Sequence, residues 1–345
     1  MEEQAAPNAA GRVGIAVLLP NERAALACDD PLLRNAHLPL RAVFHPMGFP
    51  VEVVTNSVEV LAAARESWGH FKKVFPERTV ELRFGVIDDG SQNCPPEAIY
   101  RAHLNLRLAI ADANNFCTCD LKEGFAFAWL TRAAVEHHNY FRYYFLEAAA
   151  AFFLIDSPSV TLLHAACVKM AGRGVLLCGD SAAGKSSLAF ACARAGWTYL
   201  SDDLSCLVQG GEDHVVVGNP HMFRFRDSAV HLFPELHRES IAAHRVGKPT
   251  IEFPSSRMPE ITTADRCSID YIVFLNRREP DPPGLIPFPR DIALQWFEQG
   301  ISADELREAR LAAIHNLLTV EILELRYGDL DCAVRELEKL VTKDI

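Results

Sequence analysis

The sequence lacks the features that would place the protein in a membrane or outside the cell. No apolar run reaches the roughly 20 residues that a membrane-spanning helix needs; the nearest candidate, residues 148–155, is closed by Asp156. The ten cysteines include no C-x-x-C pair, and only Cys117 and Cys119 lie close together, so neither a disulfide framework nor a zinc motif is indicated. The polar, acidic residues 1–12 are unlike a signal peptide. We therefore expect a cytoplasmic protein with reduced thiols and no membrane partner.

Positive charge is also in short supply. The 34 Lys and Arg residues are outnumbered by 45 Asp and Glu residues, which gives a formal net charge of −11 and argues against nucleic acid as a partner. The sequence shows no internal repeat and no low-complexity tract, and 49% of its residues are hydrophobic, which is ordinary for a globular protein. At roughly 150 residues per domain, the 345 residues predict two domains.

Residues 1–155 are predicted to form a smaller α/β or α+β domain of unknown role, behind a loose tail at 1–12. Apolar residues that alternate with period two predict the strands. These strands are expected at residues 42–54, 79–87, 104–110 and 124–130. A helix is expected at 57–68, and a segment rich in Ala, Phe and Tyr predicts a long, mostly buried helix at 132–154.

Residues 156–345 are predicted to form the second, α/β domain. Strands at 160–170 and 174–178, a helix from 185 to about 195 and a strand at 198–200 give a βαβ-type order, which favours a sheet with helices packed on it. Further strands are expected at 204–208, 214–217, 271–275 and 320–325, helices at 291–298, 303–317 and 331–341, and a loop at 279–289.

A phosphate-binding motif, G-x-x-x-x-G-K-[ST], follows the strand predicted at 174–178. Its residues, with the serine that follows, are Gly179, Asp180, Ser181, Ala182, Ala183, Gly184, Lys185, Ser186 and Ser187. The two glycines allow backbone N–H groups to turn inward around an anion, and the helix that begins near Lys185 adds the positive end of its dipole. Lys185 can reach terminal phosphates, and the Ser186 hydroxyl can ligate Mg²⁺. The motif predicts nucleotide-phosphate binding. The alternative is a glycine-containing turn that binds no ligand, which would leave the lysine without a function.

An acidic pair, Asp202 and Asp203, directly follows the strand at 198–200. Catalytic groups collect where strands end in open α/β sheets. One carboxylate can hold Mg²⁺ and the other can accept a proton from an attacking hydroxyl. Alternatively, the two aspartates are turn or helix-capping residues.

These motifs resemble the C-terminal catalytic domain of HPr kinase/phosphorylase. His164 lies fifteen residues before Gly179, and the acidic pair lies seventeen and eighteen residues after Lys185. The family shows H-G, G-D-S-G-x-G-K-S and A-D-D at the same spacings. The resemblance is clear over residues 160–208 and diffuse from there to the C-terminus.

The resemblance implies a kinase fold akin to phosphoenolpyruvate carboxykinase, with ATP, Mg²⁺ and transfer to a serine hydroxyl. It makes Asp202 the general base, with His164 beside the base to tune its protonation. Lys185 would bind the transferred phosphoryl group, and Ser186 and Asp203 would lie on the metal side. It also implies a homo-oligomer.

Two departures separate the chain from the true HPr kinases. Ala182 replaces the middle one of the three glycines in the family's loop, and the signature E-I-R-G-L-G after the acidic pair has no counterpart. These departures indicate a related kinase and not a true HPr kinase, and they argue against HPr as the acceptor and against the reverse, phosphorylase reaction.

A basic segment at residues 219–257 offers further cations in this acidic chain. Arg224, Arg226 and Lys248 lie in loop-like settings beside Asn-Pro and Gly-Lys-Pro sequences, and we expect them around the phosphates. Ordinary solvated surface charge is the alternative.

The leading hypothesis is an ATP- and Mg²⁺-dependent kinase that phosphorylates a hydroxyl, predicted to be serine, on a protein, peptide or small molecule. A nucleotide-binding regulatory or interaction module without phosphotransfer is the main alternative. A simple NTPase is less well supported, because the sequence shows no obvious water-positioning residue.

Overall fold

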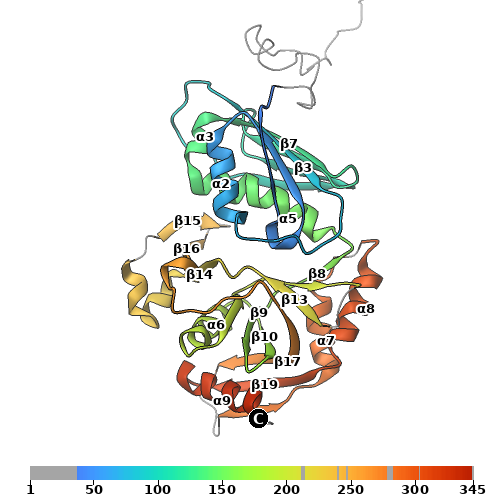
Figure 1. The fold of residues 1–345 in the computed structure, drawn as a ribbon, viewed down its shortest axis with the longest axis vertical. Coiled ribbons are helices and arrows are strands. Elements are labelled where there is room, and N and C mark those ends of the chain that lie inside the picture. The colour runs from blue at the N-terminus through green and yellow to red at the C-terminus, as the bar shows by residue number, and fades with distance from the viewer. Residues whose placement is uncertain are drawn as a thin grey trace, which may run out of the picture.

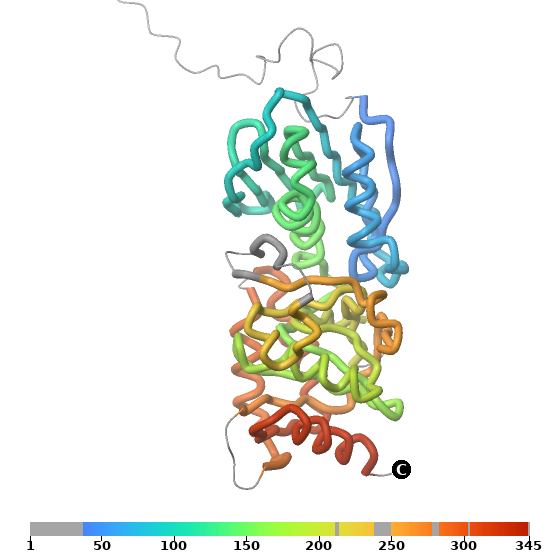
Figure 2. Tube along the Cα trace, turned by 90° about the vertical axis from the view of Figure 1, so that its left-hand side faces the viewer, coloured from blue at the N-terminus to red at the C-terminus, as the bar shows by residue number. Residues whose placement is uncertain are grey.

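The structure, a computed structural model, describes residues 37–210, 214–238, 241–245, 248–277, 283–302 and 304–343. It is mixed α/β, and its described strands form sheets of seven, nine and three strands. The first sheet uses only strands before residue 132, and the others use only strands after residue 159. Figures 1 and 2 show these two parts stacked along the long axis. The two-domain boundary at 155/156 stays a prediction, and the predicted tail at 1–12 lies outside the described residues.

The first sheet has the strand order β1-β2-β3-β7-β6-β5-β4. Its strands are β1 (Leu40–Phe44), β2 (Val51–Thr55), β3 (Val80–Ile87), β4 (Ile99–His103), β5 (Leu106–Ile110), β6 (Phe116–Asp120) and β7 (Phe125–Thr131). The single strand predicted at 42–54 is wrong, because the chain reverses at Pro46–Gly48, where Met47 has a positive φ, so that β1 and β2 pair antiparallel. The sequence also failed to predict β4 and β6.

Helices cover one face of this sheet. They are α2 (Val58–Trp68), α3 (Arg132–Glu136), α4 (His138–Phe141), a π-helical turn (Arg142–Leu146) and α5 (Glu147–Ile155). Ser57 caps α2 by accepting a hydrogen bond from the Val60 N–H. The single helix predicted at 132–154 is interrupted at His137, which has a ψ of 69°. Its burial is confirmed, since Phe141, Phe145 and their neighbours pack into the core under the sheet.

The nine-stranded sheet has the order β11-β9-β10-β17-β13-β12-β8, and β19 pairs with both β17 and β18. Its strands are β8 (Val160–Leu163), β9 (Ala166–Met170), β10 (Arg173–Cys178), β11 (Thr198–Ser201), β12 (Ser205–Val208), β13 (Val215–Gly218), β17 (Arg266–Arg277), β18 (Gly284–Pro287) and β19 (Glu321–Tyr327). The strand predicted at 160–170 is two strands that part at His164, and β18 lies inside the loop predicted at 279–289.

Helices cover both faces of the second sheet (Figure 1). They are α6 (Lys185–Arg194) and α9 (Leu330–Thr342) on one face, and α7 (Arg290–Glu298) and α8 (Arg307–Leu317) on the other. Alternate residues of β10 serve the two layers: Leu177 packs with α6 and α9, whereas Leu176 packs with α7 and α8. Among the described helices, none is long and apolar enough to cross a membrane.

A three-stranded sheet packs against α6. Its strands are β14 (Met222–Arg226), β15 (Ile241–Arg245) and β16 (Lys248–Pro254). The Phe190 ring of α6 lies 5.2 Å from the Phe223 ring and 5.0 Å from the Phe225 ring. The loop-like settings predicted for the three basic residues are therefore wrong: Arg224 and Arg226 lie on β14, and Lys248 begins β16.

Candidate functional site

The predicted site residues converge because three strand ends share one edge of the second sheet. β9 lies between β10 and β11 and runs antiparallel to both, so β10 and β11 run in the same direction. Leu177 pairs with Ala166 and Ser201 pairs with Cys167. The 179–184 loop, the acidic pair and His164, which directly follow or precede these residues, therefore lie at the same edge.

The backbone at the start of α6 is arranged to hold an anion. Gly184, with a φ of +100°, is the N-cap, and no side chain caps the helix there. The first helical bond runs from the Leu188 N–H to the Gly184 carbonyl at 2.8 Å, so the N–H groups of Lys185, Ser186 and Ser187 precede it. A Cβ at Gly184 would lie only 3.0 Å from the Tyr327 hydroxyl. Such an uncapped helix start, with its positive dipole end, is a ready anion site.

Lys185 brings a buried positive charge to this loop. Its side chain is 4% exposed, and Nζ donates to the carbonyls of Gly179 at 2.8 Å and Asp180 at 3.3 Å. Burial lowers the pKa of the ammonium, while the Asp203 carboxylate, 4.0 Å away, acts in the opposite direction. An anion in the loop would stabilise the ammonium in the same way as Asp203 does.

Asp202 is held from two sides. Its Oδ2 accepts the backbone N–H of Arg224 at 3.1 Å, and its own carbonyl accepts the Ser186 hydroxyl at 3.2 Å. Burial raises the pKa of the carboxyl to about 7; Asp203 adds to the rise and Arg224 opposes it. A carboxyl with this pKa can accept a proton near neutral pH, as a general base must.

His164 contacts Asp203, not Asp202. Its Nε2 lies 2.8 Å from Asp203 Oδ1, and both side chains are more than half exposed. The resemblance places His164 beside the predicted base Asp202, whereas its hydrogen bond here is to the neighbouring Asp203, the predicted metal-side carboxylate. The interaction can orient Asp203 towards Lys185.

The donors around Lys185 fit a magnesium ion that is bound together with phosphates. Mg²⁺ prefers oxygen ligands and commonly takes one or two carboxylates with water and substrate phosphates. The Asp203 carboxylate is 64% exposed and so accessible to an ion, and the Ser186 hydroxyl lies on the first turn of α6. Within the described ranges, no group of three or more His, Cys, Asp or Glu side chains could hold a metal by itself. A metal at this place would thus depend on the bound phosphates for further ligands.

The three predicted cations have different surroundings. The Arg226 guanidinium donates to the Ser181 hydroxyl at 2.7 Å, which brings its charge to the 179–184 loop. The Arg224 side chain instead pairs with Glu147 and Glu252. The side chain of Lys248 lies outside what the structure describes.

Two aromatic residues that the sequence did not predict contact the 179–184 loop. Trp296 Nε1 lies 3.3 Å from Asp180 Oδ1, and the Tyr327 hydroxyl donates to the Ala183 carbonyl at 3.3 Å. They are separated from these partners by 116 and 144 residues. The pairing of β10 with β17 and of β17 with β19 brings Tyr327 close, and Trp296 of α7 packs on Phe274 of β17. No local pattern could have indicated them.

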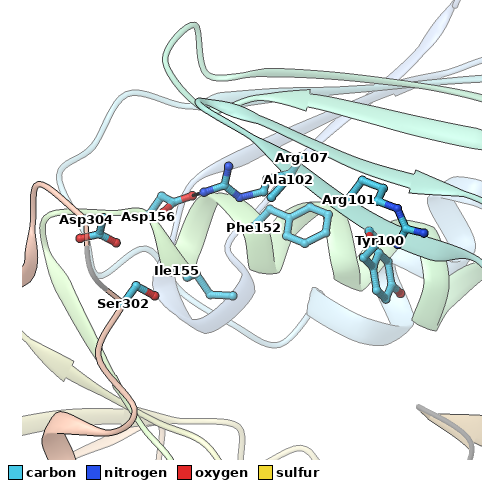
Figure 3. A pocket seen from close by; sticks show the side chains of 9 residues that line it. All are labelled: Tyr100, Arg101, Ala102, Arg107, Phe152, Ile155, Asp156, Ser302 and Asp304. Atoms are coloured by element: carbon cyan, nitrogen blue, oxygen red, sulfur yellow. Dashed lines mark hydrogen bonds and ion pairs between the residues drawn. The ribbon is translucent and has the colours of Figure 1, made fainter.

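A cavity of about 380 Å³ lies elsewhere, between the first sheet, α5 and the segment before α8 (Figure 3). Phe152 and Ile155 form its apolar part, and an ion pair of 3.1 Å joins Arg107 to Asp156 at its side. None of the predicted site residues lines it. Because the predicted phosphate loop, acidic pair and histidine meet at the sheet edge and not here, the sheet edge is the candidate site.

Comparisons with known proteins add a distant structural similarity. No protein-family model and no curated protein matches the chain. Among solved structures, the Hpr(Ser) kinase/phosphatase from Coxiella burnetii is similar at 12% sequence identity and a TM-score of 0.29, over 53% of this chain and 93% of that chain. At so low a TM-score, support for a function comes from the side chains of the site.

Proposed function

We propose that the protein is an ATP- and Mg²⁺-dependent kinase that phosphorylates a hydroxyl, of the serine type, on a protein, peptide or small molecule. One observation carries this proposal: an uncapped helix start with a buried lysine shares a sheet edge with a carboxyl whose pKa is about 7. The first two features suit a polyphosphate, and the third suits the deprotonation of an acceptor.

Each residue has a role in an in-line transfer. Asp202 takes the proton of the acceptor hydroxyl as its oxygen bonds to the γ-phosphorus, and the bond from this phosphorus to the β–γ bridging oxygen breaks to release ADP. Lys185 and the first N–H groups of α6 hold the phosphate oxygens, and Arg226 adds charge at the loop. Ser186 and Asp203 would hold Mg²⁺, which neutralises charge on the phosphates when bound.

The test is transfer of radiolabelled γ-phosphate from ATP to serine-containing acceptors, including proteins encoded or purified with this chain. Asp202→Asn is expected to lower the rate by about 10²- to 10⁴-fold, the usual contribution of a general base, with ATP binding retained. Lys185→Ala is expected to weaken ATP binding as well. Glu81→Gln, on the partly exposed face of the first sheet, is the matched control and is expected to match the wild type.

A nucleotide-binding module without turnover is the second candidate. The Lys185 ammonium favours it, because it donates to two carbonyls of its own loop, a closed arrangement. Calorimetry together with the transfer assay separates the two candidates. ATP binding with no transfer to any acceptor would support the module, and full transfer by Asp202→Asn would remove the assigned base.

A further inference from the structure

A buried group of charged residues joins the first sheet's helical layer to the candidate site. We call it the bridging cluster, and its members are Arg142, Tyr143, Glu147, Arg224 and Glu252. Three members come from the π-helical turn and the start of α5, and two come from β14 and β16. The cluster therefore connects residues before position 156 with the strand next to Asp202.

Each charge in the cluster has at least two opposite partners. Glu252 accepts Arg142 Nη2 at 2.6 Å, Arg224 Nε at 3.2 Å and the Tyr143 hydroxyl. Glu147 accepts Arg142 Nη2 at 3.0 Å and Arg224 Nη2 at 3.4 Å. The side chains of Arg142 and Glu252 are only 3% and 4% exposed. Removing one partner would leave a buried charge uncompensated, so displacing any of these side chains from its partners is costly.

The π-helical turn is what aligns the two N-terminal charges. Arg142 and Glu147 are five residues apart, a spacing that does not bring side chains face to face on an α-helix. In a π-helical turn the bond runs from residue i to i+5, and the Glu147 N–H indeed donates to the Arg142 carbonyl. Single π-helical turns occur frequently at functional sites.

Arg224 carries the cluster to Asp202. On β14 it pairs in register with Glu252 on β16, and its backbone N–H donates to Asp202 Oδ2 at 3.1 Å. We propose that Arg224 is a positioning residue for Asp202, and that Glu147 holds Arg224 in place, so that residues before position 156 complete the active site. This inference rests on the proposed function. It gives the first sheet a role, because a partner that shifts α5 would change the rate of catalysis without contacting the nucleotide.

The kinetic test compares two carboxylates of similar chemistry. Glu147→Gln is expected to lower kcat by about tenfold with the KM for ATP unchanged within about twofold, because a slightly misplaced base slows transfer while Lys185 and α6 are untouched. Glu66→Gln is the control: Glu66 pairs with Arg142 at 2.8 Å, whereas the ion pairs of Arg224 are with Glu147 and Glu252, so kcat should stay at the wild-type value. Arg224→Lys, which keeps the charge, should retain more activity than Arg224→Gln.

A second measurement does not need transfer activity. Hydrogen exchange of peptides that cover residues 201–206 and 222–226 should be faster in Glu147→Gln than in the wild type and in Glu66→Gln. Unchanged exchange in Glu147→Gln would overturn the proposal even if the protein is no kinase. It would also be overturned if Glu147→Gln and Glu66→Gln lowered kcat equally, because the cluster would then act only through general stability.

Discussion

The two large sheets are covered in different ways. In the first sheet, β7 alternates between buried residues such as Ala128 and partly exposed ones such as Phe127 and Trp129, because helices cover only one face. In the second sheet, β10 is buried from Gly174 to Cys178, because helices cover both faces.

This difference in packing determines where functional side chains can lie in each sheet. When both faces are packed, side chains along the strands are committed to the core, and functional groups must stand where the strands end. The 179–184 loop, Asp202 and His164 all occupy such ends. None of the proposed site residues lies at a strand end of the first sheet. The helical layer of that sheet contacts the site instead, through Glu147, which pairs with Arg224.

The largest expected effect tests this difference in packing. Leu176→Ala should lower the free energy of unfolding by about 2–5 kcal/mol, because it leaves a cavity in a fully buried strand. Leu108→Ala, on a partly exposed position of β5, should cost less than about 1 kcal/mol. Urea denaturation of the two variants measures both values. Equal losses would mean that the partly exposed face of the first sheet is covered as thoroughly as the second sheet.

Much of the candidate site could be predicted from the sequence, because its residues directly follow predicted strands. The motif before Lys185 and the acidic pair follow two predicted strands, and parallel strands place such residues at one edge. The strands at β3 and β7 and the helix α2 were also predictable, because alternation and a serine N-cap are local signals.

What could not be predicted depends on distant parts of the chain. Arg224 was expected to face phosphates, but Glu147 and Glu252 bind it, and they lie 77 and 28 residues away. The break at His164 was hidden, because the apolar pattern continues through residues 160–170 while the chain leaves one strand and enters another. Neither the partners of Arg224 nor the break at His164 can be seen in the local amino-acid composition.

A smaller effect concerns pH and tests whether the chemistry belongs to the second sheet's edge. Asp202 must be deprotonated to act as a base, and burial raises the pKa of its carboxyl to about 7. The transfer rate should therefore rise with pH and level off above about 7, falling about tenfold for each unit below about 6. Initial rates from pH 5 to 9, with ATP binding measured at each pH as the control, check this. A flat profile would exclude Asp202 as the base.

The smallest expected effect compares backbone strain in the two parts. Ala182 in the 179–184 loop has a φ of +75°, and Leu104 in the β4–β5 turn has a φ of +50°. Both residues occupy a left-handed conformation that costs roughly 1–2 kcal/mol for a residue with a Cβ. Replacing either by glycine relieves that strain but raises the entropy of the unfolded chain, which costs roughly 0.4–1 kcal/mol, so each variant should gain between about 0 and 1.6 kcal/mol. Ala183→Gly, at a position without positive φ, should instead lose stability. Thermal unfolding of the three variants measures these signs, and a loss in Ala182→Gly would show that the loop is not strained at this position.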